Sequence, residues 1–292
     1  MFLSLLHVNV GDDPERDQPG RRWLRDIYRV HQRLWMAFPD AKRRAEDEFF
    51  LGAWGGPEIP EPKPKRGEAG FLFRIEHDGK PRILIQSARK PEWNYAFQNA
   101  PFLLTKEPDV REFDPAPRCD HAYSFRLLAN VVRRKSVIRS DGKTRITRSG
   151  LTLARKRRTE ILVHPDPIPA LLPHDPMERQ RLLRARWDPW RKWLESVGNR
   201  HGFRVLDEKS ATLLMQAECV ILRNPGSGRG GSNQEKPTEK RYNGGLFNGV
   251  LVCKDAEKLR AALIEGIGPA KAFGFGLLSV RAGPVNDPRC LP

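Results

Sequence analysis

Tyr28 and His31 have the residue types and the spacing that proton-transfer chemistry needs. In a helix, at about 100° per residue, they lie one turn apart on the same flank. A histidine can act as a general base or acid near neutral pH, and a tyrosine hydroxyl can donate or orient. The two could share one site at the edge of a core. The alternative is that both rings pack against a sheet with their polar ends in water, and the spacing alone favours it.

A glycine-rich stretch over residues 266–276 is the second candidate. Its notable residues are Gly266, Gly268, Lys271, Gly274 and Gly276. Glycines let a backbone approach a phosphate closely, and a lysine adds charge. The stretch is not a Walker loop, which ends in Gly-Lys-Ser/Thr, and not a dinucleotide fingerprint, which runs from strand to helix. A tight connection that needs positive φ angles explains the glycines equally well.

The charge of the chain points to a polyanionic partner. Its 292 residues include 52 Lys and Arg against 36 Asp and Glu, a net charge of +16. Nucleic acid is the first candidate and an anionic membrane surface the second. The segment 133–158 concentrates this charge, with Asp141 as its only acidic residue. Its basic residues are Arg133, Arg134, Lys135, Arg139, Lys143, Arg145, Arg148, Arg155, Lys156, Arg157 and Arg158.

The turn signal at 140–143 predicts that this segment is a projecting β-hairpin. Such a ribbon can lie against a groove of duplex nucleic acid, where arginine offers a planar fork to phosphates. A solvated surface loop is the alternative, but so many like charges would repel one another on an ordinary surface.

Several classes of function receive no support. The acidic residues are dispersed, so we predict no metal and no cofactor, and RNA cleavage would use the RNA's own 2′-hydroxyl. The four cysteines form no Cys-x-x-Cys pair, which indicates inert thiols in a reducing cytoplasm. No apolar run approaches ~18 residues, no signal peptide is evident, and no basic amphipathic helix suits a membrane surface. We therefore expect a cytoplasmic protein with no membrane partner.

The elements that must position these residues repeat one pattern. The first half predicts a strand over 1–10, a helix over 21–38, a hairpin of strands 71–76 and 81–86, a weak helix and a short strand at 102–104. The second half predicts strands at 123–132, 203–206, 212–222, 246–252 and 277–280, with helices over 188–197 and 255–265.

We therefore predict an α+β fold of two tandem ferredoxin-like (RRM-related) βαββαβ domains, at residues 1–110 and 121–282. The Pro-rich stretch 105–120 is the predicted linker. Residues 55–67 and 224–240 are expected to be loops with no assigned role.

Four segments resemble one known family. They are Tyr-Arg-Val-His-Gln-Arg-Leu-Trp-Met-Ala-Phe-Pro at 28–39, Leu-Ile-Gln-Ser at 84–87, Phe-Arg-Leu-Leu-Ala-Asn at 125–130, and the glycine-rich residues 266–279. The family is CasE, the CRISPR RNA-processing endoribonuclease of type I-E (Cascade) systems. The resemblance implies a tandem ferredoxin-like fold and metal-independent cleavage of precursor CRISPR RNA at the 3′ base of each repeat stem-loop. The implied products carry a 2′,3′-cyclic phosphate and a 5′-hydroxyl, and the enzyme stays on the hairpin as a Cascade subunit.

The resemblance also implies residue roles. His31 becomes the general acid or base, and Tyr28 its partner in orienting or activating the 2′-hydroxyl, which reverses the preference drawn from spacing. A third role is unassigned, because Met36 lies where some relatives have a basic or polar residue. The predicted RNA-binding residues are Arg133, Arg134, Lys143, Arg145, Arg148, Arg155, Lys156, Arg157, Arg158, Gly266, Gly268, Lys271, Gly274 and Gly276. The alternative function is a non-catalytic subunit that binds the same RNA stem-loop; the presence of both Tyr28 and His31 favours the nuclease.

Overall fold

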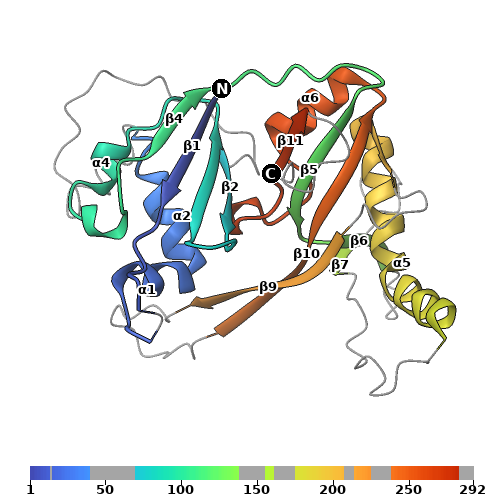
Figure 1. The fold of residues 1–292 in the computed structure, drawn as a ribbon, viewed down its shortest axis with the longest axis horizontal. Helices are drawn as coiled ribbons and strands as arrows, with labels where there is room; N and C mark the ends of the chain where they lie inside the picture. Colours follow the sequence, from blue (N-terminus) through green and yellow to red (C-terminus); the bar gives the residue numbers. More distant parts are fainter. Residues whose placement is uncertain are drawn as a thin grey trace, which may run out of the picture.

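The computed structural model describes residues 1–13, 15–39, 70–137, 155–160, 175–206, 214–224 and 238–282. These residues form two main antiparallel sheets, which lie side by side and are joined by the segment after β4, and a separate two-stranded sheet (Figure 1). The loop predicted at 55–67 and most of the loop predicted at 224–240 lie outside the described residues.

The first half has one sheet with the strand order β2-β3-β1-β4, and each neighbouring pair is antiparallel. Its elements are β1 (Phe2–His7), α1 (Pro19–Arg25), α2 (Ile27–Trp35), β2 (Phe71–Glu76), β3 (Arg82–Ser87), α4 (Trp93–Phe97), the 3-10 helix η1 (Pro101–Leu103) and β4 (Asp109–Glu112).

Two predictions for the first half are wrong. The single helix expected over 21–38 is two helices, because Asp26 adopts an extended conformation between them and caps the second. The strand expected at 102–104 is largely η1, which starts at Pro101, and Leu104 makes only an isolated bridge to Val8. The fourth strand is β4, which lies inside the predicted linker.

The second half repeats the arrangement with the order β11-β5-β10-β8. Its elements are β5 (Ala122–Ala129), β6 (Val132–Val137), β7 (Arg155–Glu160), α5 (Pro176–His201), β8 (Phe203–Leu206), β9 (Leu214–Asn224), β10 (Thr238–Cys253), α6 (Ala256–Glu265), the 3-10 helix η2 (Lys271–Phe273) and β11 (Leu278–Ala282). When β6, β7 and β9, which lie outside this order, are left out of the count, the four remaining strands of the second half have the same order as those of the first, 4-1-3-2, which the ferredoxin-like plan requires. The predicted α+β class is therefore confirmed. The division into residues 1–110 and 121–282 stays a proposal, and β4 runs across its first boundary.

Two elements of the second half are longer than predicted. Helix α5 starts at Pro176 instead of 188, because residues 177–186 are mostly strong helix formers and extend the helix on the N-terminal side of Pro189. Strand β10 spans sixteen residues; its first part pairs with β9 to form an arm, and its last part pairs with β5 and β8 in the sheet. Figure 1 shows this arm leaving the second sheet and running below the first half.

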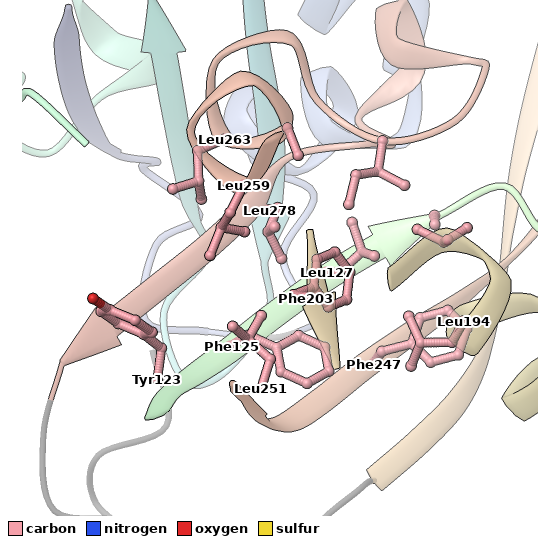
Figure 2. Packing of buried hydrophobic residues seen from close by; sticks show 14 of the residues in the cluster. Tyr123, Phe125, Leu127, Leu194, Phe203, Phe247, Leu251, Leu259, Leu263 and Leu278 are labelled. Carbon is pink, nitrogen blue, oxygen red and sulfur yellow. The ribbon is translucent and has the colours of Figure 1, made fainter. Parts of the chain in front are cut away.

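Each half has its own hydrophobic core. In the first, alternating residues of β2 and β3, such as Phe73, Ile83 and Ile85, are fully buried beneath Val30 and Leu34 of α2. In the second, the inward side chains of β5 and β10 pack against α5 and α6 (Figure 2). These two cores hold the helices α2 and α6 against their sheets.

The opposite face of the first sheet packs against the second half. Arg74 and Gln86, which alternate with the core residues of β2 and β3, are 1% and 3% exposed. The Gln86 amide donates to the Leu263 carbonyl over 2.5 Å, and Arg74 reaches residues of β5 and β11. Both faces of β2 and β3 are therefore covered.

Candidate functional site

The two predicted catalytic residues lie on the first turns of α2. The Asp26 carboxylate accepts hydrogen bonds from the backbone N–H groups of Tyr28 at 3.1 Å and Arg29 at 3.2 Å, which satisfies donors that a helix start leaves open. This cap starts the helix one residue before Tyr28. The helical spacing then places His31 among the buried residues of α2, one turn from Tyr28.

Tyr28 and His31 differ sharply in exposure. Tyr28 is 49% exposed, while His31 is 7% exposed and lies in an aromatic cluster. The imidazole stacks on Phe71 at 5.3 Å between centroids and on Phe73 at 6.2 Å, and Trp35 meets it edge-on at 5.3 Å. The structure thus presents an exposed tyrosine one turn from a histidine that aromatic rings hold in place.

The glycine-rich stretch lies against α2 and β2. Gly274 has a φ of 83°, and a Cβ there would meet Phe73 at 3.5 Å and Ile27 at 3.8 Å. Gly266 has a φ of 74°, and a Cβ there would come within 2.7 Å of Leu72. The stretch therefore needs glycine both for its backbone conformation and for its close contact with the first half.

The glycines differ in what they can offer a ligand. Gly268 is exposed, and its Cβ position is open apart from the Asn130 carbonyl at 3.8 Å. Gly266, Gly274 and Gly276 are buried, so their placement favours packing, and Gly268 has the accessible backbone. Lys271 is half-buried and its ammonium donates to the Glu265 carbonyl at 2.5 Å, at the end of α6.

Two strands of the predicted basic hairpin are described, while its predicted turn at 140–143 lies outside the described residues. Strands β6 and β7 pair antiparallel, with Arg134 opposite Arg158 and Lys135 opposite Arg157. Like charges at directly opposite positions destabilise a sheet. The register therefore sets basic residues at opposite positions of the two strands. Lys143, Arg145 and Arg148 lie outside the described residues.

Two contacts of the arm were not predicted from the sequence. Tyr242, on the arm strand β10, packs its ring against Phe273 of η2 at 4.9 Å, and the arm strand β9 passes near α2. Met36 packs at the edge of the first core, so it offers no third catalytic group. The sequence signal that could have identified Tyr242 is its place as an aromatic residue inside the otherwise polar stretch 238–245.

The described residues lack two further features. Among them, no three His, Cys, Asp or Glu side chains gather as the ligands of a metal ion would. No helix in these ranges is long and apolar enough to cross a membrane. Of the cysteines, Cys253 is buried, and burial raises the pKa of its thiol, which agrees with the prediction of an inert group.

The fold and the site define a class of protein. It is a tandem ferredoxin-like protein with a basic hairpin in its second half and a Tyr–His helix packed against a glycine-rich loop. Residues 1–282 match the family model described as CRISPR associated protein, so the chain belongs to this family.

Comparison with individual proteins confirms the resemblance to CasE. The chain is similar to the CRISPR system Cascade subunit CasE of Escherichia coli, at 26% identity over 89% of this chain and 94% of that protein. It is similar to the CRISPR-associated endoribonuclease Cse3 of Thermus thermophilus, at 24% identity over 96% and 99%. Among solved structures, the Cse3 endoribonuclease bound to a 19-nucleotide RNA has the same fold, with a TM-score of 0.55, 23% identity and coverage of 96% and 100%.

Proposed function

We propose that this protein is a metal-independent endoribonuclease that cuts precursor CRISPR RNA at the 3′ base of each repeat stem-loop. The observation that carries the proposal is the Tyr28–His31 pair on one turn of α2, packed against the glycine-rich loop. The relative Cse3 is named an endoribonuclease, and the relative CasE a Cascade subunit. We therefore assign this chain the same partners, a repeat RNA hairpin and other Cascade subunits, and a cytoplasmic location.

The proposed reaction needs only proton transfers. The RNA 2′-hydroxyl attacks the adjacent phosphorus and gives its proton to a general base, and the bond from phosphorus to the 5′-oxygen breaks. The 5′-oxygen takes a proton from a general acid, so the products carry a 2′,3′-cyclic phosphate and a 5′-hydroxyl. His31 serves as acid or base, and Tyr28, whose ring is half exposed, orients or activates the 2′-hydroxyl.

The basic hairpin supplies affinity in this proposal. RNA phosphates placed along β6 and β7 would neutralise the facing cations and release counterions. In an A-form stem the recognition is mostly of shape and backbone, which suits a ribbon dominated by arginine. Gly268 is the glycine of the loop with an exposed backbone for a phosphate.

A second function is a subunit that binds the stem-loop without cutting it. The burial of His31 favours this candidate, because a histidine stacked between aromatic rings is positioned as a core residue would be. The hairpin and the fold serve both functions equally. Only the nuclease requires proton transfer at Tyr28 and His31, so activity of this pair distinguishes the two functions.

Incubation of the protein with its repeat RNA in EDTA tests the proposal. We expect a single cut at the 3′ base of the hairpin, a cyclic phosphate on the upstream product, and no cut when the nucleotide before the scissile phosphate is 2′-deoxy. Tight binding without cleavage would establish the binding subunit instead. Cleavage of the 2′-deoxy RNA would remove the 2′-hydroxyl from the mechanism.

A further inference from the structure

We propose that Arg74 is a positioning residue that fixes the glycine-rich loop of the second half against the strand on which His31 packs. The inference rests on the proposed function, because it gives the loop a defined place beside the cleavage site. It assigns a role to a residue that lies on the opposite face of β2 from His31.

The contacts of Arg74 cross from one half to the other. Its side chain leaves β2, is 1% exposed, and donates through Nη1 to the carbonyls of Arg126 at 3.1 Å and Leu277 at 3.0 Å. Its Nη2 donates to the Ser279 hydroxyl at 3.1 Å. One guanidinium therefore bonds both β5 and the chain leading into β11.

Leu277 is the residue that leaves the glycine-rich loop. The loop closes immediately before it, where the Ile267 N–H donates to the Gly276 carbonyl at 2.8 Å and the Gly276 N–H donates to the Leu128 carbonyl at 2.7 Å. At the other end of the loop, Gly266 lies against Leu72, which is also on β2. Strand β2 thus contacts both ends of the loop from one face.

The other face of β2 carries the aromatic rings that hold His31. Phe71 and Phe73 stack on the imidazole, and they alternate along the strand with Leu72 and Arg74. A shift of the second half relative to β2 would therefore move the loop relative to His31. The hydrogen bonds of Arg74 oppose this shift.

The network around Arg74 explains why the residue is an arginine. Its Nε donates to Glu76 Oε1 at 2.6 Å, while Arg126 pairs with Glu76 Oε2 at 3.1 Å and with Asp78 at 2.5 Å. Two cations and two carboxylates balance, so the buried charge is compensated. A lysine has a single ammonium and cannot bond Glu76 on one side and Leu277 and Ser279 on the other.

Displacement of a catalytic group by about 1 Å can reduce a rate by roughly 10²-fold without a comparable loss of binding. We therefore expect Arg74→Lys to cleave the repeat hairpin about 10–100-fold more slowly in single turnover. The affinity for the 2′-deoxy hairpin should fall much less than the rate, because the basic hairpin β6–β7, which supplies affinity in the proposed function, is separate from this network. The pH–rate profile should keep its shape, because Arg74 transfers no proton.

The experiment compares four proteins: wild type, Arg74→Lys, Ser279→Ala and Lys254→Met. Ser279→Ala removes one acceptor of Arg74 and leaves every charge in place, so it reports on the contact even where Arg74→Lys does not fold. Lys254→Met removes an exposed cation that pairs with Asp120, and is the control for a substitution outside this network. Each protein is assayed for cleavage in EDTA, for affinity and for amide hydrogen exchange over residues 266–277.

The expected result is slower cleavage and faster exchange over residues 266–277 in Arg74→Lys, a smaller change of the same kind in Ser279→Ala, and none in Lys254→Met. Unchanged loop exchange in both network variants, or wild-type cleavage by a folded Arg74→Lys, would overturn the inference. Failure of the wild type to cleave would instead contradict the proposed function, and the exchange data would still decide whether Arg74 holds the loop.

Discussion

His31 packs in the core of the first half and is also the acid or base of the proposed function. Its ring is held by Phe71, Phe73 and Trp35, so its orientation is set by aromatic contacts. Such fixation favours a proton-transfer group, because a ring that is already positioned loses little freedom when the substrate binds. It also means that a simple truncation confuses the two roles.

A replacement that keeps an aromatic ring at position 31 separates the packing role from the proton-transfer role. His31→Phe retains an aromatic ring among the others but has no ring nitrogen, so we expect the single-turnover rate to fall by about 10²–10⁴-fold with RNA affinity and the unfolding midpoint near wild type. His31→Ala should lose a similar factor in rate and also lose stability, because it leaves a cavity. Wild-type cleavage by His31→Phe would assign His31 to packing alone.

The sequence predicted the Tyr–His pair but not Arg74. Helical spacing is local, so the relation between Tyr28 and His31 follows from the order of residues. The strand Phe-Leu-Phe-Arg-Ile-Glu at 71–76 ends in alternating apolar and charged residues, a pattern typical of one face in water. The second half covers that face instead, through contacts between residues far apart in the sequence that no local pattern encodes.

At the scale of elements, backbone conformation and close packing restrain the glycine-rich loop, in addition to its hydrogen bonds. Gly266 ends α6 with φ 74° and ψ 165°, a region that other residues avoid. Its neighbour across the interface is Leu72, at 2.7 Å from where a Cβ would lie. Gly79 also has a positive φ, 82°, but a Cβ there would meet nothing within 4 Å.

These two glycines form a matched pair. We expect Gly79→Ala to destabilise the protein by backbone strain alone, about 1–2 kcal/mol. Gly266→Ala should lose about 1–3 kcal/mol more, because its φ/ψ lie in a glycine-only region and its methyl group would meet both Leu72 at 2.7 Å and the Gly276 carbonyl at 2.8 Å. Urea unfolding of both variants measures the difference. Equal losses would contradict the requirement for glycine at position 266.

Removing charge from the basic hairpin should have opposite effects on the stability of the free protein and on its affinity for RNA. Arg134→Gln with Arg158→Gln removes one facing pair of cations, so the free protein should be unchanged or more stable by up to about 1 kcal/mol. RNA affinity should fall, and the slope of log K against log salt should decrease by roughly 1.5 if both residues contact phosphates.

Cleavage at saturating protein should stay at the wild-type rate in this double variant. Lys258→Gln, which removes an exposed cation of α6, is the control for general charge loss. An unaltered salt slope would place these arginines outside the RNA interface.

Elements with local signals were predicted well, and those fixed by distant partners were not. The strand 71–76, the strand 203–206 and the helix capped by Asp255 carry their own turn and cap residues and match the structure closely. Strand β4 has only exposed residues and exists because β1 pairs with it. The break at Asp26 was missed because the apolar period continues through it, although Asp is a common cap.

At the scale of the whole molecule, the two halves share a charged network. The hydrogen bond from Arg126, on β5, lowers the pKa of the Asp78 carboxyl in the first half. A carboxyl whose folded pKa lies below its unfolded value, about 3.9, stabilises the fold above that value and stops doing so as the pH falls through the folded pKa.

Asp78→Asn should therefore lower the urea midpoint at pH 7, and the difference from wild type should shrink as the pH falls below about 4. Unfolding curves of both proteins at neutral and acidic pH test this. A difference that persists unchanged at the acidic end would show that the amide disturbs packing, and that the charge of Asp78 contributes nothing across the interface.

Because both faces of β2 and β3 are covered, the two halves of this chain cannot be exchanged freely with those of a relative. A chimera that joins the first half of one relative to the second half of another inherits β2 from one parent and the loop before β11 from the other. We expect it to assemble only if the second half supplies carbonyl and hydroxyl acceptors for residue 74 and a glycine against residue 72. The repeated ferredoxin-like pattern looks modular, yet in this chain the two repeats pack against each other through β2.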